Sequence, residues 1–265
     1  MPSQVWGRDP QEAFEEPYEY GIQDQFAREA RTFFARLYKL LNADRHRCSV
    51  ENRSLEKAVW LLAMDALDSL RECLEALICK KHRVGGKLFR DVMESMDLAA
   101  YFHSATEKSK TSLGKWYADE IVPHREYRDY VKKAQGPDVA EQLTKHYASL
   151  SRFTHRSYRA ILNGYSQGGE DRLVHDRTGE LYGSHESAAS LLVLPQTISS
   201  YYEVLANLAL EYATELSELG LVTSEEIREA FATSLESETV SSRFLPRRWF
   251  VERLRGSAVE KQGEK

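Results

Sequence analysis

Apolar residues return at helical spacing along most of this chain of 265 residues. From Ile22 to Leu41 they recur every three or four positions among Arg, Glu and Lys, which is the pattern of an amphipathic helix. The run from Leu55 to Ile78 is apolar over a wider face, and Ser54 stands where its hydroxyl can cap the first turn. The pattern therefore predicts two long helices, with the second at the centre of a bundle.

A third apolar pattern extends from Leu88 to Phe102, and Gly85-Gly86 before it indicates a break in the chain. Pro123 divides the next, more polar segment, because proline disrupts the helical hydrogen bonds around its own position. The segment is therefore expected to form two shorter helices. The helical period then resumes from Asp138 to Tyr165.

Short apolar runs follow at 173–175 and 180–182, joined by Asp-Arg-Thr-Gly, and they predict one small hairpin at about 172–183. From Glu186 to Leu219 the chain is rich in apolar residues but too often interrupted by polar ones for a membrane span, which favours a buried helix with a kink or restart at Pro195. We therefore expect an all-α fold, a helical bundle of about six or seven helices with one small β-hairpin insertion.

The two ends of the chain differ from its middle in composition. Residues 1–21 are rich in Glu and aromatic residues and predict a loosely attached N-terminal arm, whereas 22–235 form the bundle domain. Residues 236–265 hold arginines interleaved with Phe and Trp and end in a polar tail. Such a segment suits a single nucleic-acid strand, and an amphipathic end that docks on the bundle is the alternative.

Composition narrows the classes of function. The formal net charge of −5 argues against a generally basic surface, so any contact with nucleic acid must be local. The three cysteines form no Cys-x-x-Cys pair and are expected to be buried thiols in a reducing compartment. No secretory signal pattern opens the chain, which predicts a cytoplasmic protein without a membrane segment. The sequence has no Glu-x-x-His or His-x-x-x-His pair and no phosphate-binding glycine loop, so neither a metal nor a cofactor is expected.

The stretch from Asp138 to Tyr165 gives the strongest chemical indication. A helix there would place Tyr147 on an apolar face that runs from Leu143 to Ile161 and includes Tyr158, and Arg152 on a cationic one. His155 lies between the two faces, where an imidazole can transfer a proton beside a bound phosphate. His155 and Arg152 are therefore candidate catalytic residues for phosphodiester cleavage, with a packed structural histidine as the alternative.

On the third helix, four polar residues share one side. Arg90, Glu94, Asp97 and Tyr101 are spaced by four, three and four positions. If this side faces inward, the arginine must pair with the acids, because an unpaired buried charge is strongly destabilising. The four residues predict either a ligand-binding cluster or a structural network of ion pairs. His103 is expected in the core, and His124 on the surface.

Two stretches resemble a known family. Residues 86–94 read Gly-Lys-Leu-Phe-Arg-Asp-Val-Met-Glu, and residues 147–155 read Tyr-Ala-Ser-Leu-Ser-Arg-Phe-Thr-His. They are similar to an uncharacterised microbial helical family distantly related to the HEPN superfamily. The resemblance covers about 55–215, which it implies as a HEPN-like core.

Members of that superfamily are often ribonucleases of toxin and antiphage systems, or noncatalytic partners in them. By resemblance, the matching positions are Arg90, Glu94, Tyr147, Ser151 and His155, and they imply a polar cluster between two helices. The HEPN motif of an arginine, four to six residues and a histidine does not occur, since Arg152 precedes His155 by three positions.

The sequence thus predicts a HEPN-like protein that binds or cleaves RNA in a microbial defence or toxin-type system. Its expected partners are RNA and a second copy of the chain. One alternative is a noncatalytic helical interaction protein in which Arg90, Glu94 and His155 form a buried network. An enzyme that acts on a small phosphorylated ligand is the other.

Overall fold

The computed structural model describes residues 20–79, 81–134 and 195–235, with short stretches between them at 141, 144–145, 147–148, 158, 161, 165–167 and 173–175. These residues include seven α-helices, one 3-10 helix and two short strands. The predicted all-α bundle is therefore confirmed in its main architecture. The N-terminal arm before residue 20 and the segment 236–265 lie outside the described residues.

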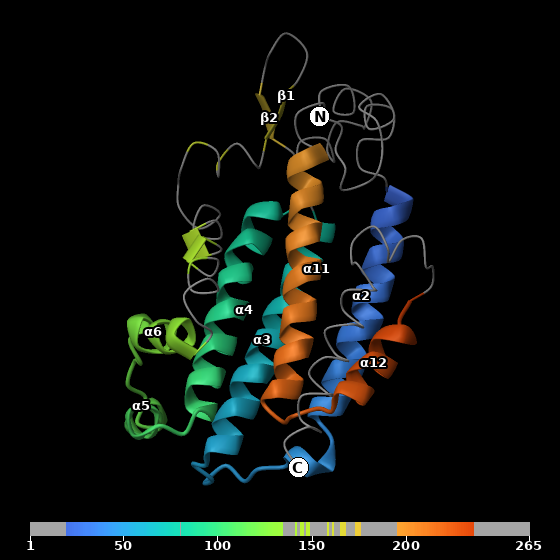
Figure 1. Cartoon of the computed structure of the whole chain (residues 1–265). Coiled ribbons are helices and arrows are strands. Elements are labelled where there is room, and N and C mark those ends of the chain that lie inside the picture. The colour runs from blue at the N-terminus through green and yellow to red at the C-terminus, as the bar shows by residue number, and fades with distance from the viewer. Residues whose placement is uncertain are drawn as a thin grey trace.

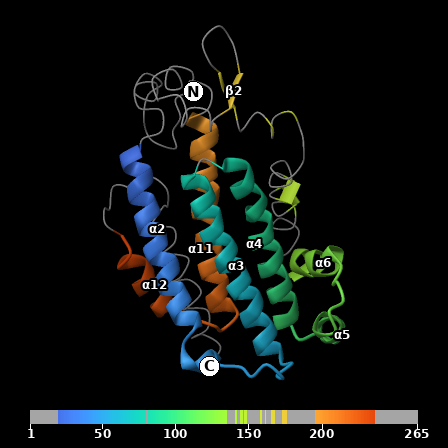
Figure 2. The same cartoon turned by 180° about the vertical axis from the view of Figure 1, so that it is seen from behind.

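Four long helices run side by side, as Figure 1 and, from behind, Figure 2 show. They are α2 (Tyr20–Leu41), α3 (Leu55–Ile78), α4 (His82–His103) and α11 (Pro195–Glu218). Helix α3 packs against the other three, and α12 (Ser224–Ala232) lies against α2 and α11. The 3-10 helix Asp44–His46 belongs to the connection from α2 to α3.

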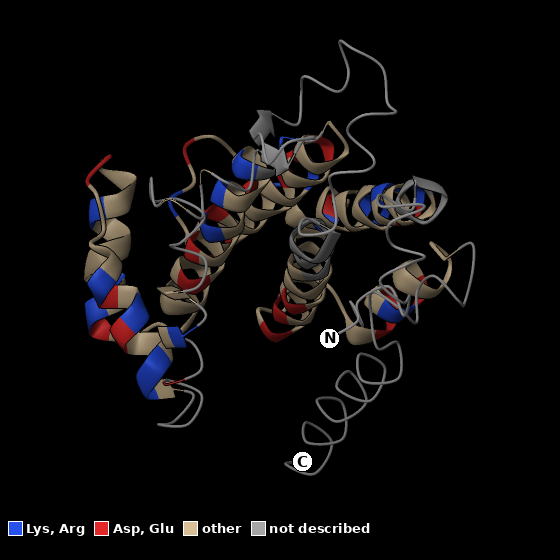
Figure 3. Cartoon of the chain, turned by 90° about the horizontal axis from the view of Figure 1, so that it is seen from above, with Lys and Arg blue, Asp and Glu red and all other residues tan. Residues whose placement is uncertain are grey.

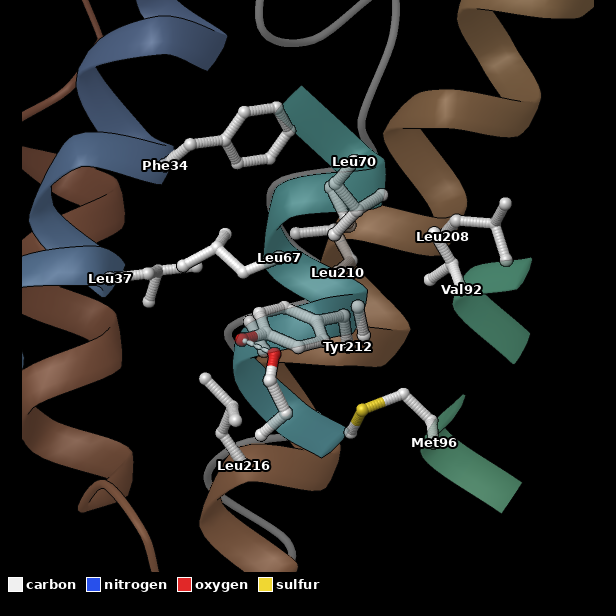
Figure 4. Close-up of a cluster of buried hydrophobic side chains, with 14 of the residues drawn as sticks. Phe34, Leu37, Leu67, Leu70, Val92, Met96, Leu208, Leu210, Tyr212 and Leu216 are labelled. Carbon is white, nitrogen blue, oxygen red and sulfur yellow. Dashed lines mark hydrogen bonds between the residues drawn. The ribbon is translucent and has the colours of Figure 1, made fainter. Parts of the chain in front are cut away.

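Helix α3 is the centre of the core because its apolar side chains cover several of its faces. Leu67 and Leu70 are fully buried. In Figure 4 they lie near Phe34 and Leu37 of α2, while α4 and α11 contribute further apolar side chains to the same cluster. The predicted cap is present too, since the Ser54 hydroxyl accepts a hydrogen bond from the backbone nitrogen of Lys57 at 3.2 Å.

The break expected at Gly85-Gly86 is wrong, because α4 begins at His82 and continues through both glycines. A methyl group added at Gly85 would lie 3.0 Å from Cδ2 of Leu77 and 3.4 Å from Sγ of Cys73, both on α3. Gly85 therefore serves close packing between α3 and α4 rather than chain reversal.

Two short helices lie outside the long ones, beside α4. They are α5 (Glu107–Tyr117) and α6 (His124–Ala134), on either side of Pro123 as predicted. In the view from above in Figure 3, positively and negatively charged positions crowd together on this pair, at the left edge of the molecule. Val131 and Tyr127 are the buried residues of α6, so one narrow face packs inward and the rest is polar.

The strands β1 (Tyr165–Gln167) and β2 (Leu173–His175) pair antiparallel, with Tyr165 opposite His175. The expected hairpin between 173–175 and 180–182 is not shown, because 176–194 lie outside the described residues. Helix α11 begins at Pro195, which fits the restart predicted there, since a first-turn residue needs no amide hydrogen. Within the described chain, no helix is long and apolar enough to cross a membrane.

Candidate polar site on helices α4 and α6

Glu94 lies at the centre of a group of polar side chains between α4 and α6. Arg90 donates from Nε to Oε1 of Glu94 at 2.6 Å, one helical turn away. Arg128 of α6 donates from Nη2 to the same oxygen at 2.7 Å. The Glu94 carboxylate is only 18% exposed, so two guanidinium groups hold it where water reaches it poorly.

His124 and Tyr127 complete the α6 side of the group. Nδ1 of His124 lies 3.3 Å from Oε2 of Glu94 and is also hydrogen-bonded to the hydroxyl of Tyr127. Tyr127 is buried, and burial raises its pKa. The His124 side chain is half exposed, so it contacts solvent as well as the less exposed Glu94 and Tyr127. Its surface position was expected from the sequence, but its bond to Glu94 was not.

Asp97 and Tyr147 form the inner end of the group. The hydroxyl of Tyr147 donates to Oδ2 of Asp97, and the guanidinium carbon of Arg128 lies 3.9 Å from the centre of the Tyr147 ring. Such a cation–π contact stabilises a partly buried pair by about 1–2 kcal/mol. Burial raises the pKa of Asp97 to about 6, although the Tyr147 bond and the Arg128 charge lower it. We call this set of side chains the Glu94 cluster: Arg90, Glu94, Asp97, His124, Tyr127, Arg128 and Tyr147.

Tyr101 does not join the Glu94 cluster, although its spacing places it on the same side of α4. Its hydroxyl lies 3.3 Å from Oγ of Ser112 in α5, and Ser112 donates to Oε2 of Glu126 in α6 at 3.0 Å. Tyr101 is fully buried. This second link fastens α5 and α6 to the end of α4.

The predicted catalytic pair is not placed by the structure, because Arg152, His155 and the neighbouring Ser151 lie outside the described residues. Of the apolar face predicted around them, the structure describes Tyr147, Tyr158 and Ile161, and Tyr147 is buried as expected. Tyr158 is 76% exposed and Ile161 41%, so the prediction is wrong at those two positions. Helical spacing indicates which side chains share a face but not whether a neighbour covers that face along its whole length.

Residues 164–168 read Gly-Tyr-Ser-Gln-Gly, which matches the Gly-x-Ser-x-Gly pattern of serine hydrolases. That chemistry needs its serine on a sharp turn between a strand and a helix. Ser166 instead lies in the middle of β1, directly opposite Val174 of β2. The sequence pattern is therefore present without the backbone geometry that a nucleophilic serine needs.

Chemically, the Glu94 cluster can hold an anion or move a proton, since it combines two guanidinium groups, an imidazole and two carboxylates. No group of three or more His, Cys, Asp or Glu side chains that could hold a metal ion occurs among the residues that the structure describes. His124 and Arg128 were missed by sequence reasoning, because their contacts with Glu94 depend on how α6 crosses α4.

No known protein family, curated protein or solved structure matches this chain.

Proposed function

We propose that this chain is a HEPN-like helical protein that acts on RNA, and that the Glu94 cluster holds the segment beginning at Tyr147 against α4. The observation that supports this proposal is the contact between the two stretches that resemble the family. Tyr147 opens the second stretch and bonds to Asp97, just beyond the first. Arg128 contacts both Tyr147 and Glu94, and so ties the two stretches together.

In this proposal, the anchored Tyr147 positions Arg152 and His155 farther along the same segment. His155 takes the proton of the RNA 2′-hydroxyl as that oxygen attacks the adjacent phosphorus, and Arg152 neutralises the charge that develops on the phosphate. The bond from phosphorus to the 5′-oxygen breaks, and the leaving 5′-oxygen takes a proton from water. Glu94 and Asp97 do not touch the substrate, since the first is bound by two arginines and the second by Tyr147. Cleavage of this kind suits a microbial defence or toxin-type system.

The test is an assay of the full-length chain with fluorescently labelled single-stranded RNA, in which binding and cleavage are measured together. His155→Ala should lower the cleavage rate by at least about 100-fold and leave binding intact, as expected for loss of a general acid or base. His103→Ala is the matched control, because His103 is an exposed histidine at the end of α4. Equal cleavage by both variants, or no RNA binding by the wild type, would refute the proposal.

A noncatalytic interaction protein, acting as a homodimer, is the second candidate. The observation that favours it is that Glu94 binds Arg90 and Arg128 through one oxygen and His124 through the other, as in a purely structural network. In that case Glu94→Gln should lower the melting temperature without changing any RNA binding. Sedimentation of the wild type as a dimer would support this candidate, and a monomer at all concentrations would contradict it.

A further inference from the structure

We propose that Arg90, Arg128 and His124, held around Glu94, form a binding site for a phosphate group. The inference rests on the proposed function for the natural source of that group, the RNA backbone. The same chemistry would also accept a free phosphate or a phosphate monoester, and the experiment below separates these sources.

The ion pairs with Glu94 use only one nitrogen of each of the two arginines. A guanidinium carries N–H groups on three nitrogens in a planar fork that matches phosphate oxygens. Arg90 binds Glu94 through Nε, and within the described residues its two Nη groups have no other partner. Arg128 binds through Nη2, which leaves Nη1 for a ligand, since its Nε has no partner within the described residues but is buried away from solvent. Glu94 thus occupies one nitrogen of each guanidinium and orients the others.

The side chains of Arg90, Arg128 and His124 are partly buried but remain accessible to solvent. The Arg90 and Arg128 side chains are 29% and 26% exposed, and His124 is 53% exposed. Solvent, and hence a small anion, can reach all three. Because the groups are partly removed from water, they attract a charged ligand more strongly than fully exposed side chains do.

Negative charge near the solvent-exposed groups of the Glu94 cluster would weaken the binding of an anion. Asp97 is only 7% exposed and is engaged by Tyr147, so it does not face a ligand there. Nδ1 of His124 is held by Glu94 and Tyr127, which leaves Nε2 as the atom that can reach a bound anion. Two acids compete with an anion for these groups: Glu94, which pairs with all three, and Asp91, an exposed residue close to Arg90 and Glu94. Removing the charge of Asp91, which leaves the ion pairs of Glu94 in place, should therefore strengthen phosphate binding.

The experiment is isothermal titration calorimetry of the full-length chain with inorganic phosphate. The wild type should bind phosphate, Arg90→Gln should bind it at least about tenfold more weakly, and Asp91→Asn should bind it more tightly. Arg71→Gln is the matched control, because Arg71 also pairs with an acid on its own helix but lies on α3, outside the Glu94 cluster. Circular dichroism of each variant separates a lost site from a lost fold.

Absence of phosphate binding by the wild type overturns the inference. So does equal affinity in Arg90→Gln and Arg71→Gln. Asp91→Asn keeps every ion pair of Glu94, so it tests the site even if Arg90→Gln fails to fold, and unchanged affinity in it also counts against the inference.

A parallel titration with a short RNA distinguishes this inference from the proposed function. Phosphate binding without RNA binding leaves the phosphate site standing and removes the RNA function. RNA binding that neither Arg90→Gln nor Asp91→Asn changes, while phosphate affinity follows both variants, leaves the phosphate site standing and removes the RNA backbone as its ligand. RNA affinity that follows phosphate affinity through both variants supports the two together.

Discussion

At the scale of single residues, burial decides how Asp97 ionises and gives it a measurable effect on stability. Its pKa is raised from 3.8 to about 6 by burial. The folded protein therefore holds this proton more tightly than the unfolded chain does, and the free energy of unfolding should fall as the pH rises from about 4 to about 6, then level off. Asp97→Asn keeps an oxygen for the Tyr147 hydroxyl and should be about 2–3 kcal/mol more stable than the wild type at pH 8.

Urea unfolding at pH 4, 6 and 8 measures this difference. Asp68→Asn is the control, since Asp68 is an acid on α3 whose side chain is 57% exposed, and it should change stability little at any of these pH values. If the free energy of unfolding of Asp97→Asn falls between pH 4 and 6 as steeply as that of the wild type, the pH dependence belongs to another group.

The sequence predicts those residues of the Glu94 cluster whose contacts lie within one helix, but not those whose partners lie on another helix. The spacing of Arg90, Glu94 and Asp97 is a property of one helix, and the three do lie on one side of α4. His124 had no such pattern, because its partner Glu94 lies on another helix. His103 was expected in the core and is exposed, since its place on an apolar stripe does not ensure a covering neighbour at the helix end.

The cysteines make the same point about helix ends. Cys73, in the middle of α3, is buried as expected, and burial raises its pKa. Cys79 follows the last residue of α3 and is exposed, as is Cys48 before that helix. An apolar pattern thus predicts burial better inside an element than at its boundary.

At the scale of elements, two glycines inside helices should respond oppositely to the same substitution. Alanine is favoured over glycine in a helix by about 1 kcal/mol. Gly114 in α5 has no neighbour within 4 Å of an added methyl, so Gly114→Ala should raise the free energy of unfolding. Gly85→Ala would place its methyl 3.0 Å from Leu77 and should lower the free energy of unfolding by about 1–2 kcal/mol instead. Thermal unfolding of both variants tests this, and stabilisation by both would show that the Leu77 side chain moves aside for the added methyl at little cost.

The start of α12 is stabilised by a reciprocal cap. The Thr223 hydroxyl accepts from the backbone nitrogen of Glu226 at 3.2 Å, and the Glu226 carboxylate accepts from the backbone nitrogen of Thr223 at 2.8 Å. Arg45 binds both oxygens of Glu226, which holds α12 to the connection after α2. Thr223→Ala should therefore lower the free energy of unfolding, measured in urea, by about 1 kcal/mol. Thr111→Ala, at an exposed position inside α5, should change stability much less, and an equal loss in both variants would argue against the cap.

The same cap should weaken in acid. The hydrogen bond from Arg45 and the cap bonds lower the pKa of Glu226 to about 2. Because the folded protein holds this proton less tightly than the unfolded chain, the stabilisation is complete above about pH 5 and is lost as the pH falls toward 2. This dependence has the opposite direction to that of Asp97, so the two acids can be told apart by the pH range in which each acts.

At the scale of the whole molecule, the hydrophobic pattern predicts the helices and the central place of α3, because those follow from how much apolar surface each segment must bury. The pattern does not predict that α6 crosses α4 at Glu94. That crossing depends on contacts such as Arg128 with Glu94, 34 residues apart. The candidate site lies at this crossing, which is why its composition could be predicted only for the part on α4.

Arg128 joins three parts of the molecule, since it contacts Glu94 of α4 and the Tyr147 ring from its own position on α6. Arg128→Ala should loosen α6 from α4, while the contacts among α2, α3 and α11 stay intact. Amide hydrogen exchange should therefore rise in α6 and remain unchanged in α3, because regions that open independently exchange independently. Arg125→Ala is the matched control on the same helix, as that side chain is 91% exposed and pairs only with Asp129 within the described chain. If exchange instead rises equally in α3 and α6, the Glu94 cluster is part of the folding core, and a locally opening site on this face is ruled out.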